Sequence, residues 1–252
     1  MAFDRKFLLT VARLTAAGTL VLGGRTARHP ALMALVALYL YPTLRRNGTW
    51  HGPVPTRFRT SRPGVWLTID DGPDPRCTPL YLDMLDEYEA AATFFVIGRR
   101  CAEHPGVCRD ILRRGHTVGN HTWSHPAGLW WALPPWSVRR EVVLGQAAIR
   151  AACGISPRFF RSPAGMCGPW IHRAAAGEGL RIVGWSADGF DGCPRAPTDV
   201  ASEILAGAMP GAILLLHVGP RVRHRLLTLR RVLDGLRERG LRCVIPDGED
   251  LL

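Results

Sequence analysis

The chain has 252 residues, enough to bury a sizeable core, and a formal net charge of +11, because 32 basic residues outnumber 21 acidic ones. A basic surface can bind nucleic acid, anionic lipid or acidic glycans, but no zinc-finger, helix-turn-helix or RNA-binding signature accompanies the scattered arginines, which argues against nucleic acid. The seven cysteines form no Cys-x-x-Cys pair and have no tight spacing, so we expect buried free thiols rather than a structural zinc site or a complete disulfide framework.

Residues 1–46 differ in composition from the rest of the chain. Two apolar runs, Phe7–Gly23 and Ala31–Tyr41, are separated by a short basic stretch and followed by Arg45 and Arg46. Each run is short for a lone transmembrane helix, which needs about 20 apolar residues, and no convincing secretory cleavage site is present. An uncleaved anchor, a helical hairpin and an amphipathic pair lying on the membrane are the competing interpretations, and a soluble helical extension is the alternative. Because the basic flanks favour anionic lipid, we predict a helical, membrane-associated segment.

Residues 47–63 are rich in Gly and Pro and predict a linker ahead of a domain at 64–252. Within that domain, short apolar runs alternate with segments of helical periodicity. The predicted strands are Val65–Ile69, Ala92–Ile97, Thr117–Gly119, Phe159–Phe160, Ile182–Trp185, Ala212–Leu216 and Leu241–Ile245. The predicted helices are Thr78–Tyr88, Pro105–Arg114, Ser137–Cys153 with Ser137 as its cap, and Leu226–Arg239. This alternation predicts an α/β fold with a parallel sheet covered by helices, which can close as a barrel.

The first predicted strand, Val65–Ile69, ends at two adjacent carboxylates, Asp70 and Asp71, and Gly72 and Pro73 then break it into a turn. Two acids at the end of a core strand are costly unless a cation or strong hydrogen bonds meet them. Chemistry in such folds collects at the carboxyl ends of the strands. The pair is therefore a candidate site, with an ordinary Asp-Gly turn as the alternative.

A second candidate is the pair His121 and His125. If the backbone there is helical, this spacing places both imidazoles on one face, where they can bind one metal ion. One carboxylate from the Asp pair would complete a ligand set of two His and one Asp. That set suits catalytic zinc and also non-haem iron, although no cosubstrate site for an iron oxygenase is evident.

Three further polar groups follow later predicted strands. Arg161, in the segment Arg-Ser-Pro-Ala-Gly, could pair with a carboxylate in bidentate fashion, or it is a strand-end arginine on a turn. Asp188 and Asp191 form either a site or an Asx turn. His217 ends a strongly apolar run, so its imidazole must find a partner, as a functional group or as a satisfied core histidine.

Together, these segments resemble a known family. In order, Thr-Ile-Asp-Asp-Gly-Pro, His-Thr-x-x-His, Arg-x-Pro-x-Gly, Trp-Ser-x-Asp-x-x-Asp and Leu-Leu-Leu-His resemble the motif series of the polysaccharide deacetylases, the carbohydrate esterases that share the chitooligosaccharide deacetylase homology domain. Each motif alone is weak, but the ordered set is specific, and the similarity covers about 65–245. The resemblance implies a distorted (β/α) barrel and a divalent metal, usually zinc.

The resemblance also implies roles for individual residues. The implied metal ligands are Asp71, His121 and His125. Asp70 is implied as the general base, aided by Arg161, and His217 as the general acid, tethered by Asp191. These roles agree with the needs of amide hydrolysis, which requires an activated water, a stabilised oxyanion and a proton for the leaving amine.

The implied oxyanion and substrate-pocket residues are Ala164, Leu215 and Gly192. Two of them depart from the family pattern, because Gly192 stands where Trp is usual and Ala164 where Tyr is frequent. Both positions normally help to wall the acyl pocket and the substrate groove. The departures concern the choice of acyl group and glycan, and leave the metal ligands and the proton carriers intact.

The sequence thus predicts a membrane-associated, metal-dependent hydrolase that removes an N-acetyl or similar acyl group from an amino sugar of a polysaccharide, oligosaccharide or glycolipid. One alternative is hydrolysis of another non-peptide amide or imide on the same fold. Another is a metal-binding or glycan-binding domain without activity. The intact proton carriers and metal ligands argue against the latter, because a decayed site should lose at least one of them.

Overall fold

The computed structural model describes residues 5–252. Its strands form one parallel sheet in the order β5-β4-β3-β2-β1-β7-β6, and β8 also pairs with β1. The strands are β1 (Gly64–Gly72), β2 (Ala92–Val96), β3 (Thr117–Asn120), β4 (Phe159–Phe160), β5 (Arg181–Ile182), β6 (Ala187–Asp188), β7 (Ile213–His217) and β8 (Arg242–Cys243). The predicted parallel sheet is confirmed. It curls into a half-barrel rather than a closed barrel, because the two end strands, β5 and β6, do not pair with each other in the part of the chain that the structure describes.

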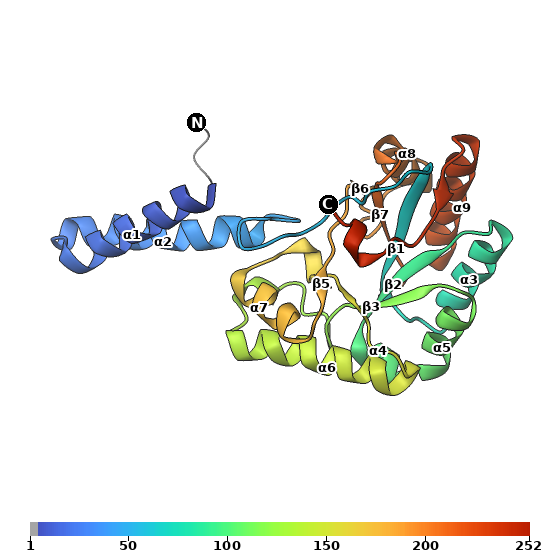
Figure 1. Cartoon of the computed structure of the whole chain (residues 1–252), viewed down its shortest axis with the longest axis horizontal. Coiled ribbons are helices and arrows are strands. Elements are labelled where there is room, and N and C mark those ends of the chain that lie inside the picture. The colour runs from blue at the N-terminus through green and yellow to red at the C-terminus, as the bar shows by residue number, and fades with distance from the viewer. Residues whose placement is uncertain (1–4) are drawn as a thin grey trace.

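Helices follow most of the strands and cover the outside of the sheet (Figure 1). They are α3 (Thr78–Glu87), α4 (Gly98–Glu103), α5 (Pro105–Arg113), α6 (Pro135–Cys153), α7 (Pro169–Gly177), α8 (Pro197–Gly207) and α9 (Val222–Glu238). The 3-10 turns are η1 (Trp130–Ala132), η2 (Pro163–Gly165) and η3 (Gly248–Asp250). The sequence patterns do not predict α4, α7, α8 or β6.

The two faces of β1 pack in different cores. Val65, Leu67 and Ile69 pack beneath the outer helices, whereas Trp66 points into the half-barrel. A parallel sheet of this kind is buried on both faces, which explains why β1 is a nearly continuous apolar run. The inner core also contains Leu215 of β7, so the predicted pocket residue Leu215 lies inside the half-barrel.

The start of α6 differs from the prediction. We expect Ser137 to cap this helix, but the helix begins at Pro135 with Pro134 in the N-cap position, and Ser137 lies inside the first turn. A proline at the first helical position is favourable, because its fixed φ suits the helix and its missing N–H would have no intrahelical partner. The prediction of the cap is therefore wrong by three residues.

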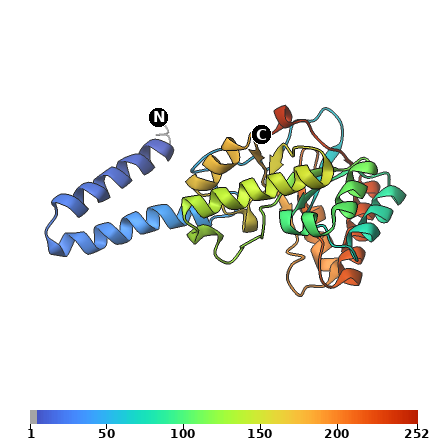
Figure 2. The ribbon, with the colours of Figure 1, turned by 90° about the horizontal axis from the view of Figure 1, so that it is seen from below.

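The N-terminal segment is a helical hairpin of α1 (Arg5–Leu22) and α2 (Arg25–Leu44), which lie side by side and project from the domain (Figures 1 and 2). The Arg13 guanidinium donates to the Leu38 carbonyl across the hairpin, at 3.3 Å. Pro30, expected between two separate runs, lies inside α2. Within residues 5–252, no helix combines the length and the apolar content that crossing a membrane requires.

Residues 47–63 contain no helix and only isolated bridges to the domain. Val54 and Phe58 are buried, and Phe58 pairs with Leu251 near the C-terminus. At the start of the segment, the Asn47 amide donates to the Gly165 carbonyl at 2.9 Å. The segment is thus held against the domain at several points.

Candidate active site

A bulge at the end of β1 places two neighbouring carboxylates in one site. In a regular strand, Asp70 and Asp71 would point to opposite faces of the sheet. The register between β1 and β2 shifts between Asp70 and Gly72, and Asp71 has a φ of 70°. Bulges of this kind re-aim a side chain and are frequent next to active sites. Both carboxylates therefore lie within 4 Å of His121.

Asp71 lies between the two predicted histidine ligands. Its Oδ1 is 3.6 Å from Nε2 of His121 and 3.5 Å from Nε2 of His125, and the two imidazole centroids are 4.6 Å apart. Burial lowers the pKa of each histidine to about 4, so both are neutral at pH 7 and each can offer a nitrogen lone pair. Burial alone would raise the pKa of Asp71, but the neighbouring His121 and other basic groups outweigh it and lower the pKa.

The tautomer of His121 is set by the backbone. Its Nδ1 lies 2.8 Å from the Arg161 carbonyl, which can only accept, so the proton is on Nδ1 and the lone pair of Nε2 faces Asp71. A carbonyl behind a histidine is the usual support of a metal-ligating imidazole.

These three residues fit a divalent metal ion. Oδ1 of Asp71 is buried and has no hydrogen-bond partner, which is costly for a carboxylate oxygen unless a cation meets it. Asp71, His121 and His125 form one of the groups of described residues whose ligand atoms lie within 4.8 Å of one another. Two imidazoles and one carboxylate with open positions suit a catalytic zinc ion.

The backbone between the two histidines is not helical, so the expectation based on helical spacing is wrong. His121 follows β3, and a turn with positive φ at Thr122 (66°) and His125 (56°) brings the second imidazole back to the first. Glu141 of α6 holds this turn, because its carboxylate accepts the amide and hydroxyl hydrogens of Ser124, both at 2.8 Å. Left-handed residues without a glycine are strained and cluster at functional sites.

Arg161 is fully buried beneath Asp70. Its Nη1 donates to Oδ1 of Asp70 at 3.0 Å and to the Thr68 hydroxyl at 2.6 Å, while Nη2 donates to the Gly184 carbonyl at 2.8 Å. The expected bidentate pairing is wrong, because only one guanidinium nitrogen contacts the carboxylate. The guanidinium also stacks on Phe95, 4.3 Å from the ring centroid. Burial raises the pKa of Asp70, and the positive charge of Arg161 opposes that rise.

His217 stands beside Asp70 at the edge of the sheet, because the two residues are register partners of β7 and β1. Nδ1 of His217 is 2.5 Å from Oδ1 of Asp191, and the His217 amide donates to Oδ2 of Asp191 at 2.9 Å. Burial alone would lower the pKa of His217, but the hydrogen bond and charge of Asp191 outweigh it and raise the pKa to about 9. The imidazole is therefore a cation at pH 7.

Arg225 of α9 is a site residue that the sequence does not indicate. Its Nη1 donates to Oδ2 of Asp191 at 3.2 Å and to the His217 carbonyl at 2.8 Å. The residue lies among several arginines of one helix, and no motif distinguishes it. Its role becomes visible only in the folded structure, where α9 brings Arg225 next to His217 and Asp191.

Asp188 lies at the rim of the site, where it forms the Asx turn considered above and also an ion pair that the sequence does not indicate. Its Oδ1 accepts the Phe190 amide at 2.7 Å in an Asx turn, and its Oδ2 pairs with Arg46 at 3.1 Å. The Arg46 guanidinium also lies 4.4 Å from the centre of the Phe190 ring. The end of the N-terminal hairpin therefore forms part of the rim of the site.

The remaining predicted pocket residues border open space. Gly192 is exposed, and a Cβ added to it would contact nothing within 4 Å. Ala164 is exposed on η2 with a φ of 52°. The family usually has a tryptophan at position 192, and Trp130 is a candidate to fill that space. Trp130 is buried, however, and its indole N–H donates to the Ser162 hydroxyl at 2.7 Å, so it does not occupy this position.

A cluster that fits a metal ion, a buried carboxylate and an imidazolium lie together at the carboxyl edge of a curled parallel sheet, an arrangement suited to hydrolysis. A family model described as "Polysaccharide deacetylase" matches residues 58–183. The chain is 42% identical over 156 residues to a chitooligosaccharide deacetylase of Bradyrhizobium sp. (strain ANU 289), covering 62% of this chain and 70% of that protein. It is 30% identical over 182 residues to a peptidoglycan-N-acetylglucosamine deacetylase of Bacillus cereus, covering 71% of this chain and 66% of that one.

A solved structure of a family 4 carbohydrate esterase from Streptomyces lividans, in complex with acetate, aligns with a TM-score of 0.68 at 28% identity. The alignment covers 75% of this chain and 95% of that one. The chain belongs to the polysaccharide deacetylase family, which confirms the resemblance seen in its motifs. It is a hydrolase of that family, acting on carbon–nitrogen bonds other than peptide bonds.

Proposed function

We propose that the chain is a zinc-dependent deacetylase that removes N-acetyl groups from glucosamine residues of a chitooligosaccharide or of peptidoglycan. The observation that supports this best is the pairing of Asp70 and His217 on adjacent strand ends, beside the cluster around Asp71. A base and an acid then flank the position of the scissile amide. The substrate class follows the names of the two curated relatives.

The residues of the chain supply the proton transfers. Asp70, held next to Arg161, takes a proton from the attacking water. His217, kept cationic by Asp191, gives a proton to the departing amine. The amide N–H of Ala164 donates to the developing oxyanion. Asp71, His121 and His125 would hold a divalent cation, and the bound cation would supply the Lewis acidity that polarises a carbonyl and acidifies water.

The test is acetate release by the purified full-length protein. The substrate panel contains acetylated chitooligomers, peptidoglycan fragments and a set of cyclic amides, each measured after chelation and after zinc is restored. Zinc-restored release from either glycan is expected. Activity only on cyclic amides would replace the proposal with the alternative amidase, and binding without turnover on any substrate would replace it with a non-catalytic domain.

We expect the pH dependence to report His217. Its pKa of about 9 lies above the ordinary value of 6.5, so the proton is present at neutral pH and is lost as the pH rises through about 9. The wild-type kcat/KM should then show an alkaline limb near that pH. In Asp191→Asn the negative charge that raises the pKa of His217 is lost, while burial still lowers that pKa. The alkaline limb should therefore move to lower pH.

The control for this pH profile is Asp199→Asn, a change of the same chemistry at an exposed position of α8. Its limb should coincide with that of the wild type. An Asp191→Asn enzyme with an unshifted alkaline limb would contradict the role of the His217–Asp191 pair.

We also propose that the N-terminal hairpin associates with a membrane surface. Apolar side chains of both helices are exposed, among them Leu14 and Met33, each 67% exposed. Arginines lie at the turn and at the end of the hairpin, where they can meet anionic headgroups. The hairpin spans Arg5–Leu44 of the predicted segment 1–46, of which residues 1–4 lie outside the described residues, and its contact with lipid stays a proposal.

The double substitution Leu14→Asp and Met33→Asp should reduce co-sedimentation with anionic phosphatidylglycerol vesicles, because each charge opposes burial of the apolar face. Acetate release in solution should be unchanged. Leu80→Asp, at an exposed apolar position of α3, is the matched control and should bind as the wild type does. Equal sedimentation of all three proteins would contradict the proposal.

A further inference from the structure

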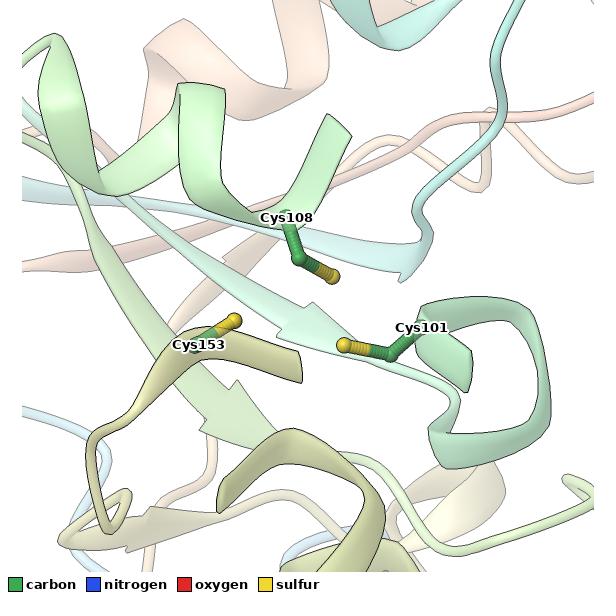
Figure 3. A group of neighbouring side chains, drawn as sticks. All are labelled: Cys101, Cys108 and Cys153. Atoms are coloured by element: carbon green, nitrogen blue, oxygen red, sulfur yellow. The ribbon is translucent and has the colours of Figure 1, made fainter. Parts of the chain in front are cut away.

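Three cysteines from three different helices meet behind the sheet. Cys101 belongs to α4, Cys108 to α5, and Cys153 is the last residue of α6. Their sulfur atoms all lie within 4.8 Å of one another. Figure 3 shows the three side chains pointing toward a common space between the helices. Spacings of seven and 45 residues in the chain give no hint of this convergence, which is why the cysteine pattern predicts no metal site.

The three cysteines differ in their exposure to solvent. Cys101 and Cys108 are fully buried, whereas Cys153 is half-buried and borders solvent. Arg109 donates to the Ala152 carbonyl at 2.9 Å and acts electrostatically on Cys153.

Other cysteines of the chain are isolated from one another and serve as a comparison. Cys77 and Cys167 are buried at separate positions in the core, and Cys243 is half-buried elsewhere. Among the described residues, they belong to no such group of ligand atoms. A single buried thiol is an ordinary small apolar side chain. Three sulfurs that face one another have the arrangement of a ligand set instead.

We propose that Cys101, Cys108 and Cys153 form a trithiolate site for a soft, thiophilic metal ion, with Cu(I) as the preferred occupant. Soft thiolates select Cu(I) and Zn²⁺ over hard cations. A structural Zn²⁺ site takes four ligands, and the described residues place no fourth ligand in this group. Three sulfurs satisfy a trigonal Cu(I), whereas Zn²⁺ would need a water at the open side near Cys153. Binding releases the protons of the three thiols to solvent.

Such an ion would join helices that support the histidine turn. The first amides of α4, those of Gly98 and Arg99, donate to the carbonyls of Thr122 and Trp123 at 2.8 and 2.9 Å. Helix α6 holds the same turn through Glu141. Metal binding at the trithiolate site should therefore stabilise the native fold, as does any ligand that binds the folded state preferentially.

The experiment titrates the full-length protein anaerobically with Cu(I) against a colorimetric Cu(I) chelator. One equivalent should bind in the wild type. Cys108→Ser and Cys153→Ser should each weaken binding by roughly 100-fold or more, because changing even a group behind a ligand can cost that much. Cys167→Ser, which removes a buried thiol elsewhere, is the control and should bind as the wild type does.

A second measurement separates this site from the histidine cluster. Co²⁺ bound to thiolates gives a near-ultraviolet sulfur-to-metal charge-transfer band, which nitrogen and oxygen ligands cannot give. The band should appear in wild type and in His121→Ala, and be lost in Cys153→Ser, whose half-buried position tolerates the change best. A binding curve shared by wild type and both cysteine variants would overturn the proposal. So would an intact mass lower by two hydrogens after purification under reductant, since two of the thiols would then form a disulfide.

Discussion

Replacing Asp70 with Asn is expected to lower kcat for deacetylation by about 10²- to 10⁴-fold, the range associated with removing a positioned general base. The amide is nearly isosteric, so it can still accept the hydrogen bond from Arg161, but it cannot accept a proton from water. The metal content should be unchanged, because Asp70 lies outside the predicted ligand set. Initial rates with the best chitooligomer, together with elemental analysis, check both parts.

Two companion variants make this result specific. His217→Ala should also keep the metal and lose turnover, because the departing amine is then left without its proton donor. Asp83→Asn, at a surface ion pair with Arg114, changes a carboxylate of no catalytic role and should leave the rate unaffected. Near-normal turnover in both Asp70→Asn and His217→Ala would show that other groups move the protons.

His121→Ala is expected to remove the active-site metal and, with it, nearly all activity. The imidazole is one of three proposed ligands, and its loss leaves Asp71 and His125 as a two-ligand set. Catalytic zinc ordinarily keeps three protein ligands. Elemental analysis should show one metal equivalent fewer than in the wild type, and added zinc should not restore acetate release.

The control for this variant is His224→Ala, which removes an exposed histidine of α9. Its metal content and rate should match those of the wild type. Because a metal ion in the cysteine cluster would add to the total, the comparison uses the difference between variant and wild type. An unchanged metal content in His121→Ala would refute the ligand assignment.

The positions of the main site residues could be predicted because each lies at the carboxyl end of a strand or directly after it. The carboxyl ends of the strands carry Asp70, His121, Arg161 and His217. Once the parallel sheet is predicted correctly, these residues are expected at one edge of it. The ordered motifs added the pairing of Asp191 with His217, which the structure bears out as a contact. The catalytic roles of these residues stay predictions.

What could not be predicted depends on local backbone and long-range packing. The bulge at Asp71 and the left-handed turn at His125 are strained conformations that local propensity does not indicate. Glu141 and Arg225 act on the site from helices, at distances set by helix packing rather than by sequence spacing. The single-nitrogen contact of Arg161 follows from the other acceptors that compete for its guanidinium.

The junction between hairpin and domain has a mechanical consequence. Helix α2 has 20 residues, which at 1.5 Å per residue make a rod about 30 Å long. Just after the helix, Arg46 forms an ion pair with Asp188 and the Asn47 amide donates to the Gly165 carbonyl. The hairpin is therefore a stiff arm rather than a flexibly linked segment. A flexible tether lets an enzyme sample a broad volume, with a local concentration set by tether length. If the hairpin binds a surface, as proposed above, a stiff arm would instead hold the site at a fixed distance from that surface, which would favour substrate segments presented near that height.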